Sequence, residues 1–315
     1  MTKYKHLFGP VPSRRFGRSL GIDLTPYKTC SFDCVFCQLG RTTAKTFERK
    51  EYVPVKDVIE ELDDWLKSSG EADYITLSGS GEPTLHSRFG EIIDFIRSSS
   101  SIPVVLLTNG SMLKYADVRA AASKANIVKL SLSAGDQDLF EHINRPPPDV
   151  SLKVLVEGMQ HFRDEFAGEL WLEVFVIWGA NSTPKDISRI AELAKTFKPD
   201  RIQLNTAVRP PAESFVHPMP KQKLENLATY FDPPAEVIAE FSSDYTSSAK
   251  ASEDTILAML QRRPCTTKEI SAALGLHINE VSKYIGKLER TSVIQAKPTG
   301  HKVYYTCCLE AGVSE

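Results

Sequence analysis

Three cysteines near the start of the chain are the residues best suited to chemistry. Cys30, Cys34 and Cys37 have the spacing C-x3-C-x2-C, and the other three cysteines lie far away in the sequence. Such a cluster in a long chain is more typical of a metal site than of a disulfide framework. Three thiolates on a [4Fe–4S] cluster would leave one iron open, since such clusters usually take four. A zinc site would need a fourth ligand, and neither His6 nor His86 has zinc-finger spacing.

A glycine-rich segment follows a predicted strand and is the second candidate for chemistry. It reads Ser78-Gly79-Ser80-Gly81-Glu82-Pro83-Thr84. The glycines would let the backbone approach a ligand closely, and the Glu82 carboxylate could pair with an ammonium group. By itself, such a segment is also typical of a tight turn between a strand and a helix.

Together with Phe36, directly before the last cysteine, these motifs resemble the signature of the radical S-adenosylmethionine (SAM) superfamily. The resemblance implies one [4Fe–4S] cluster on the three cysteines, with SAM chelating the open iron. It also implies reductive cleavage of SAM to a 5′-deoxyadenosyl radical, which abstracts hydrogen from a substrate. This sequence has Ser80 where the usual motif has glycine. The cofactor-binding residues implied are Phe36, Gly79, Ser80, Gly81, Glu82, Thr108, Asn109, Ser131, Ser133 and Asn205.

Further segments, at residues 11–15, 17–23, 143–146 and 204–211, narrow this resemblance. They are similar to a family of small prokaryotic radical SAM proteins, distantly similar to the tRNA-modifying enzyme of wybutosine synthesis. The resemblance covers about residues 7–215. Arginines in these segments would suit a substrate carboxylate or phosphate, or else close the barrel by salt bridges. They are Arg14, Arg15, Arg18, Arg145 and Arg209.

Short apolar runs alternate with amphipathic helices over much of the chain. The predicted strands are residues 20–26, 74–79, 104–110, 127–133, 170–179 and 201–206, and the predicted helices include 55–69, 89–99, 138–143 and 184–197. The alternation is typical of βα units with a parallel sheet, either an open barrel or a doubly wound sheet. With the resemblance, we expect an α/β fold, a partial (β/α)6 TIM-like barrel whose active site lies at the carboxyl ends of the strands.

The sequence divides into three predicted parts. Residues 1–215 form the radical SAM partial-barrel domain, residues 216–250 a helical and linker extension, and residues 251–315 a winged-helix domain. The last part has predicted helices at 252–264, 266–275 and 277–294, followed by a hairpin at 296–306. Its eight Lys and Arg against seven Asp and Glu leave it nearly neutral. This balance favours a protein-contact or substrate-presenting role over nucleic-acid binding.

Composition sets the remaining expectations. The chain is 42% hydrophobic and 25% charged, which is typical of a soluble globular protein. No run of about 18 apolar residues suggests a membrane span, and the start of the chain lacks a secretory signal, so we expect a cytoplasmic enzyme with no membrane partner. The substrate is an RNA base, a small metabolite or a peptide. The resemblance adds an electron donor such as flavodoxin or ferredoxin.

One alternative belongs to another class of protein. An iron–sulfur transcription regulator could sense redox state through the three cysteines and bind DNA through the winged helix. This hypothesis explains both ends of the chain. It does not explain residues 79–82 or the long βα repeat, so a radical SAM oxidoreductase or transferase is the favoured interpretation.

Overall fold

The computed structural model describes residues 4–13, 16–68, 70–238 and 253–308 of the chain. Its centre is an eight-stranded sheet in the order β1-β2-β5-β6-β7-β8-β9-β10. Strand β1 is antiparallel to β2, and all other neighbours are parallel. The strands are β1 (Leu7–Ser13), β2 (Gly17–Ile22), β5 (Tyr74–Leu77), β6 (Val104–Thr108), β7 (Ile127–Ser131), β8 (Glu169–Phe175), β9 (Arg201–Asn205) and β10 (Glu236–Val237). The prediction of an α/β fold with a mostly parallel sheet is confirmed.

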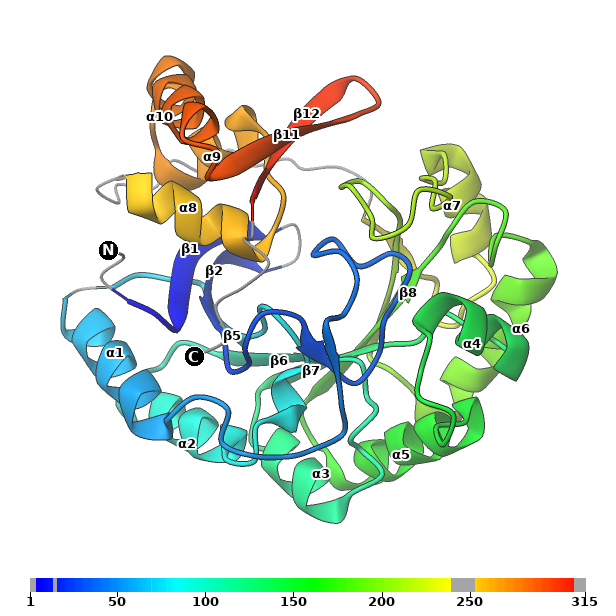
Figure 1. The fold of residues 1–315 in the computed structure, drawn as a ribbon. Coiled ribbons are helices and arrows are strands. Elements are labelled where there is room, and N and C mark those ends of the chain that lie inside the picture. The colour runs from blue at the N-terminus through cyan, green and yellow to red at the C-terminus, as the bar shows by residue number, and fades with distance from the viewer. Residues whose placement is uncertain (1–3, 14–15, 69, 239–252, 309–315) are drawn as a thin grey trace.

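Helices cover the convex face of this sheet, which curves into an open barrel (Figure 1). Each buries one apolar stripe: in α1 the stripe is Val55, Val58, Leu62 and Trp65, at helical spacing. The helices are α1 (Val55–Lys67), α2 (Phe89–Ser99), α3 (Ala116–Ala122), α4 (Gln137–Asn144), α5 (Leu152–Glu165), α6 (Pro184–Phe197) and α7 (Lys221–Ala228), with a short 3-10 helix at Pro83–Leu85. None of the helices described is long and apolar enough to cross a membrane.

The concave face of the sheet carries the other half of each strand's side chains. Near the amino ends of the strands, Phe16, Val105, Ile127 and Trp171 form an apolar cluster. Two residues further along β7 and β8, in agreement with the period of a strand, come the charged residues Lys129 and Glu173. The barrel interior is therefore apolar at one end and polar towards the other.

The predicted strands all appear, with somewhat different ends, but two further strands of this sheet, β1 and β10, were missed. The segment LFGPVPS of β1 contains prolines, which argue against a strand, and it is tolerated because β1 lies at the sheet edge. Strand β10 has two residues and pairs with β9, so the predicted helical and linker extension also contributes a strand to the sheet. Helices α3 and α5 were missed as well. Residues 239–250 of the predicted helical and linker extension lie outside the described residues.

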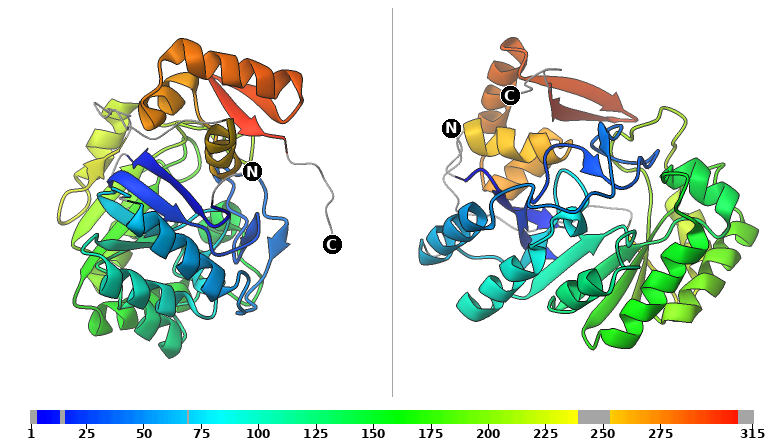
Figure 2. Two further views of the ribbon diagram at one scale, coloured as in Figure 1. Left: turned by 90° about the vertical axis from the view of Figure 1, so that its left-hand side faces the viewer. Right: turned by 60° about the horizontal axis from the view of Figure 1, so that its bottom comes forward.

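The C-terminal domain, residues 253–308, contains three helices and a hairpin in the predicted order. They are α8 (Glu253–Arg262), α9 (Thr267–Leu274), α10 (Ile278–Arg290), β11 (Ile294–Thr299) and β12 (Lys302–Cys307). A capping box between Thr266 and Glu269 begins α9, and Gly275, in the left-handed region at φ 65°, ends it. Figures 1 and 2 show this domain beside β1 and over one end of the barrel.

Candidate functional site

The cysteine loop, residues 28–45, is closed at its base by local pairing. Strand β3 (Thr29–Cys30) pairs in parallel with β4 (Ala44–Lys45). Between them, the backbone N–H of Thr42 donates to the Asp33 carboxylate at 2.6 Å, and its hydroxyl donates to the Phe32 carbonyl at 2.8 Å. The loop therefore has a defined shape before any ligand is considered.

Helix α4 supports this loop from outside the barrel wall. The carbonyls of Ile143 and Asn144, at the carboxyl end of α4, accept the N–H groups of Val35 and Asp33 at 2.9 and 3.1 Å. These are carbonyls that a helix end leaves without internal partners. Main-chain bonds to a neighbouring helix therefore add to the local pairing that fixes the position of the loop.

Each cysteine sulfur accepts a hydrogen bond from a different part of the chain. Asn109, just after β6, donates to Cys30 Sγ at 3.7 Å, and Asn144, at the end of α4, donates to Cys34 Sγ at 3.3 Å. Lys28 Nζ donates to Cys37 Sγ at 3.2 Å. Donors aimed at sulfur stabilise a thiolate and tune an iron–sulfur cluster bound to it.

The protonation of the free thiols also fits a metal-bound state. Burial, reinforced by the charge of Glu82, raises the pKa of Cys30 to about 12. Burial likewise raises the pKa of Cys34, and the two neighbouring cysteines add to this shift. Buried thiols of this kind become thiolates when a metal cation displaces their protons.

Within the described ranges, no three His, Cys, Asp or Glu side chains converge on a single metal ion. A [4Fe–4S] cluster differs from a single ion because it offers a separate iron to each thiolate. Three partly exposed thiols, each with an N–H donor at its sulfur, therefore fit such a cluster.

The glycine-rich loop, residues 78–82, packs directly against the cysteine loop. The Glu82 N–H donates to the Thr29 carbonyl at 3.1 Å, and the Lys28 N–H donates to the Ser80 carbonyl at 2.8 Å. A Cβ atom on Gly81 would lie 1.8 Å from the Thr29 carbonyl oxygen, so only glycine fits there. The two motifs recognised in the sequence therefore form one structural unit.

The Glu82 carboxylate lies inside this unit and is fully used by protein donors. It accepts hydrogen bonds from the Thr84 N–H and hydroxyl, from the Thr108 hydroxyl at 2.7 Å and from the Asn109 N–H at 2.8 Å. Burial raises its pKa, and these donors oppose the shift. Thr108 and Asn109, each predicted as a cofactor contact, therefore both donate to Glu82, and Asn109 also donates to Cys30 Sγ. Their contact with SAM stays a prediction.

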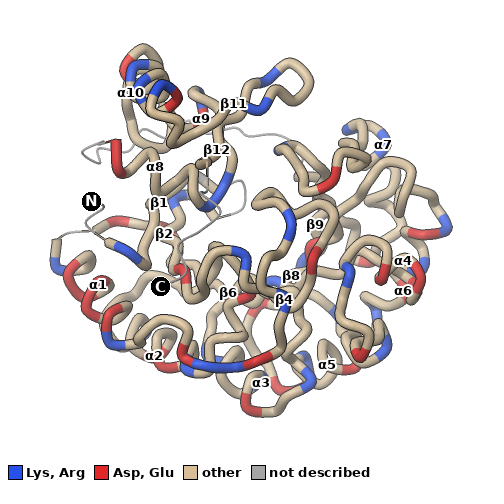
Figure 3. Tube along the Cα trace, viewed as in Figure 1, with Lys and Arg blue, Asp and Glu red and all other residues tan. Residues whose placement is uncertain are grey.

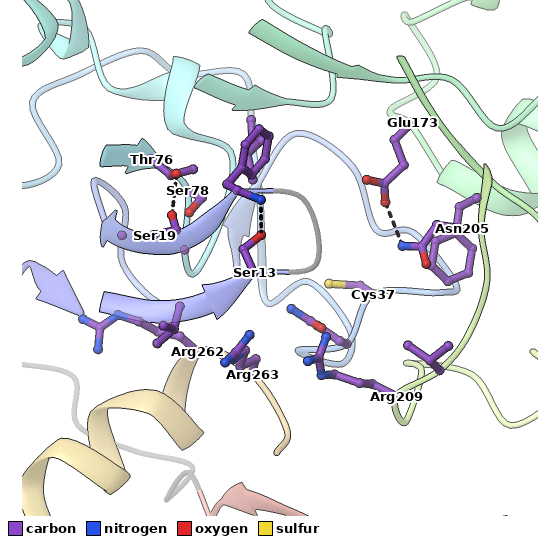
Figure 4. A pocket seen from close by; sticks show the side chains of 18 of the residues that line it. Ser13, Ser19, Cys37, Thr76, Ser78, Glu173, Asn205, Arg209, Arg262 and Arg263 are labelled. Atoms are coloured by element: carbon purple, nitrogen blue, oxygen red, sulfur yellow. Dashed lines mark hydrogen bonds between the residues drawn. The ribbon is translucent and has the colours of Figure 1, made fainter. Parts of the chain in front are cut away.

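A cavity of about 390 Å³ opens beside these loops at the carboxyl ends of the strands (Figure 4). Of the predicted residues, Phe36, Gly79, Gly81 and Asn205 line it. Cys37 also lines it, and in Figure 4 its sulfur points into the open space. The Phe36 ring stacks on Phe175 with centroids 4.3 Å apart, which makes a flat aromatic wall.

Other predicted residues lie elsewhere. Ser80 donates to the Asp23 carboxylate from both its N–H and its hydroxyl. Ser133 is buried and accepts the Phe175 N–H at 3.0 Å, which is a structural role at the end of β8. Neither Ser131 nor Ser133 is among the described residues that line the cavity.

The sequence analysis missed the polar group in the barrel interior. Glu173 lines the cavity, forms an ion pair with Lys129, and accepts a hydrogen bond from Asn205 Nδ2 at 3.0 Å. A signal was present, because each of these charged residues interrupts an otherwise apolar strand. A charge buried in such a strand needs a partner, and that partner here lies on the next strand.

Two cavity residues come from the C-terminal domain and had no sequence signal. Arg262 ends α8, and Arg263 follows it; both line the cavity. Arg262 pairs with Asp23 at 3.1 Å across the domain boundary. The domain therefore closes one side of the site.

Of the arginines predicted as substrate anchors or barrel salt bridges, Arg209 lines the cavity, where it pairs with Glu269 at 3.0 Å. Arg18 pairs with Asp73 and Glu71. Arg145 pairs with Glu213 at 2.6 Å, beside the cysteine loop. Arg14 and Arg15 lie outside the described residues.

Comparison with known proteins agrees with this geometry. The family model described as "Radical SAM superfamily" matches residues 24–206. A UPF0026 protein of Methanocaldococcus jannaschii is 32% identical over 85% of this chain and 85% of its own length, and one of Helicobacter pylori is 33% identical over 95% and 96%. A Brachyspira hyodysenteriae protein named GTPase Obg is 35% identical over 93% of this chain, which spans 44% of that protein's length.

Solved structures show the same fold at low identity. A radical SAM methyltransferase from Sphaerobacter thermophilus superposes with a TM-score of 0.56 at 15% identity, covering 71% of this chain and 67% of that one. Fold and sequence thus define an α/β protein with a mostly parallel sheet. The chain belongs to the radical SAM superfamily and, within it, is a member of the UPF0026 family. Its cofactors are a [4Fe–4S] cluster and SAM.

Proposed function

We propose that this protein cleaves SAM reductively and uses the resulting radical on a substrate held in the cavity. The observation that carries the proposal is the position of Cys37, whose sulfur opens into the 390 Å³ cavity at the carboxyl ends of the strands. When bound, the cluster and SAM supply a 5′-deoxyadenosyl radical that abstracts hydrogen from the substrate. We propose that this substrate is an RNA base, a small metabolite or a peptide.

The chain's own residues then have distinct tasks. Lys28, Asn109 and Asn144 donate hydrogen bonds to the three sulfurs, which would stabilise the thiolates once a cluster is bound. Phe36, stacked on Phe175, gives an apolar surface on which an adenine ring can pack. The C-terminal domain covers one side of the cavity and so limits access of water to a reactive centre.

The direct test is anaerobic reconstitution with iron and sulfide, followed by dithionite and SAM. We expect a brown protein with about four irons per chain that releases 5′-deoxyadenosine. About eight irons would contradict the prediction of one cluster. Absence of a cluster, or a cluster that never yields the nucleoside, would refute the proposal.

A pair of cysteine variants makes this test specific. In Cys34→Ala one ligand is lost, so iron content and nucleoside formation should both fall to near background. Cys307→Ala removes a half-buried thiol at the end of β12 and should behave as wild type. Equal iron in the two variants would show that the cysteine loop is not the cluster site.

The C-terminal domain supports a substrate-presenting or protein-contact role more than binding to nucleic acid. Its element order is that of a winged helix, with α10 as the candidate recognition helix. Acidic and basic residues are mixed along α10 (Figure 3), and Lys287 pairs with Glu253. A DNA-reading helix usually presents a clearer basic surface. We also propose that flavodoxin or ferredoxin supplies the electron for SAM cleavage.

The alternative, a redox-sensing regulator, predicts sequence-specific binding to DNA. It leaves the glycine-rich loop and the polar barrel interior without a role. A gel shift with genomic DNA that flanks the gene distinguishes the two hypotheses. Salt-sensitive, sequence-specific binding without SAM cleavage would favour the regulator.

A further inference from the structure

One wall of the cavity is built from arginines of two different domains. Arg209 comes from the segment after β9, and Arg262 and Arg263 come from the end of α8. In Figure 4 the three side chains lie along the same side of the cavity, which Cys37 also faces. Residues about 55 positions apart therefore form one surface.

The charged side chains that line the cavity are mostly basic, although Arg209 and Arg262 are paired with the carboxylates of Glu269 and Asp23. The charged residues among those described as lining the cavity are these three arginines and Glu173. Glu173 lies on β8, in an ion pair with Lys129. An anion in the cavity would meet positive charge at the arginine wall.

Two of the arginines also hold the domains together. Arg209 donates to the Pro264 carbonyl at 3.1 Å and pairs with Glu269, and Arg262 donates to the Lys5 carbonyl at 3.0 Å and pairs with Asp23. Their side chains are 9% and 11% exposed, so both ion pairs are largely removed from water. Domain docking accounts for these two residues.

Arg263, directly after Arg262, is the third residue of the wall beside Arg209 and Arg262. It lies between them in Figure 4, and it lines the cavity. Burial lowers its pKa and the nearby positive charge of Arg209 lowers it further, while Cys265 and Glu269 oppose the shift. A bound anion would offset both effects.

We propose that the arginine wall binds an oxyanion of the substrate, a carboxylate or a phosphate, with Arg263 as its main contact. The planar guanidinium group matches two oxygens of either anion. The C-terminal domain then supplies part of the substrate site. The assignment of this anion to a substrate rests on the function proposed above. The binding of the anion itself does not depend on that function.

The first experiment uses the full chain without a cluster and needs no turnover. Calorimetric titration with inorganic phosphate and, separately, with malonate should give saturable binding to wild type. Arg263→Gln should weaken binding by at least about tenfold, because a charge-assisted pair is lost. The stronger of the two probes identifies the chemistry of the anion. No saturable binding of either probe would overturn the proposal.

A matched control separates the site from general surface charge. Arg290→Gln removes the same charge from an exposed position on α10 and should bind both probes as wild type does. If the two variants bind equally, the proposal is wrong.

Circular dichroism and thermal unfolding show whether Arg263→Gln is folded. A second substitution tests the proposal even if it is not. Arg263→Lys keeps the charge but loses the planar pair of donors. We expect binding between that of wild type and that of Arg263→Gln. Wild-type affinity in a folded Arg263→Lys protein would show that the guanidinium group is not the contact.

The last experiment distinguishes substrate from cofactor, since SAM also carries a carboxylate. Phosphate or malonate binding is measured on the reconstituted protein with and without saturating SAM. Unchanged affinity supports a separate substrate site, and displacement by SAM overturns it. Failure here leaves nucleoside formation by wild type intact, whereas failure of the proposed function would abolish that product and leave anion binding in the cluster-free chain.

Discussion

The cysteine loop and the C-terminal domain face the same cavity but are held in place differently. The cysteine loop is fixed by main-chain hydrogen bonds to α4 and to the glycine-rich loop. The C-terminal domain is attached by side chains: Val11 of β1 enters its apolar core, and Arg262 pairs with Asp23. One region is held mainly through main-chain hydrogen bonds, the other through side-chain contacts.

This difference suggests how the two regions serve the site. A cluster needs ligands whose positions vary little, and main-chain bonds from neighbouring elements provide that. The position of the arginine wall depends instead on the C-terminal domain, which docks as a unit. Asp23 links the two regions, because its carboxylate accepts from Ser80 and pairs with Arg262.

The largest effect should follow from breaking the contact between the two loops. Gly81→Ala places a methyl group 1.8 Å from the Thr29 carbonyl, so the backbone must shift. Because this overlap is with backbone, we expect a loss of at least about 3 kcal/mol in the free energy of unfolding and a sharp fall in iron content after reconstitution. Gly40→Ala is the control: its φ of 86° brings strain, but no atom lies within 4 Å of the added group. Normal iron content in Gly81→Ala would show that the loops do not act together.

A somewhat smaller loss should come from the attachment of the C-terminal domain. Arg262→Met leaves the buried Asp23 carboxylate without its cation and should lower the free energy of unfolding by about 3 kcal/mol, with cluster binding retained. Lys287→Met breaks an ion pair whose side chains are 60% and 34% exposed, so it should cost less than about 1 kcal/mol. Urea unfolding measures both. Equal losses in the free energy of unfolding for the two variants would show that the Arg262–Asp23 pair contributes no more than an exposed ion pair.

The apolar part of this attachment can be tested separately. Val11→Ala removes two carbons from the core that β1 shares with α8 and α9, at a cost of about 2 kcal/mol. Hydrogen exchange should quicken in α8 and α9 more than in α5, which connects β7 to β8 further along the sheet. Val303→Ala, at a position 43% exposed, is the control and should change little. A uniform change in exchange would contradict a domain held mainly through β1.

The smallest expected effect tests whether α10 lies outside the site. Gly286 lies within this helix, and an added Cβ would have Arg290 Nη1 at 3.5 Å as its nearest neighbour. Gly286→Ala should therefore raise the free energy of unfolding by about 0.5–1 kcal/mol. Thermal unfolding measures the gain, and iron content should stay unchanged. A fall in iron content would show that α10 is coupled to the cysteine loop.

The sequence by itself determined the cluster chemistry and most of the elements. The spacing of Cys30, Cys34 and Cys37 is a local property, and so are the periods of apolar residues that predict helices and strands. Helices α2 and α6 have the predicted bounds for this reason. Strand β1 was missed because its prolines oppose a strand locally, while pairing with β2 at the sheet edge overrides that preference.

Only the tertiary structure decided which side chains share the cavity. Glu173 and Lys129 meet because β7 and β8 pair in one register, and Arg262 reaches Asp23 across 239 positions of chain. Contacts at such separation depend on how whole elements pack, which no local pattern of residues encodes. The arginine wall therefore emerges only when the C-terminal domain docks on β1.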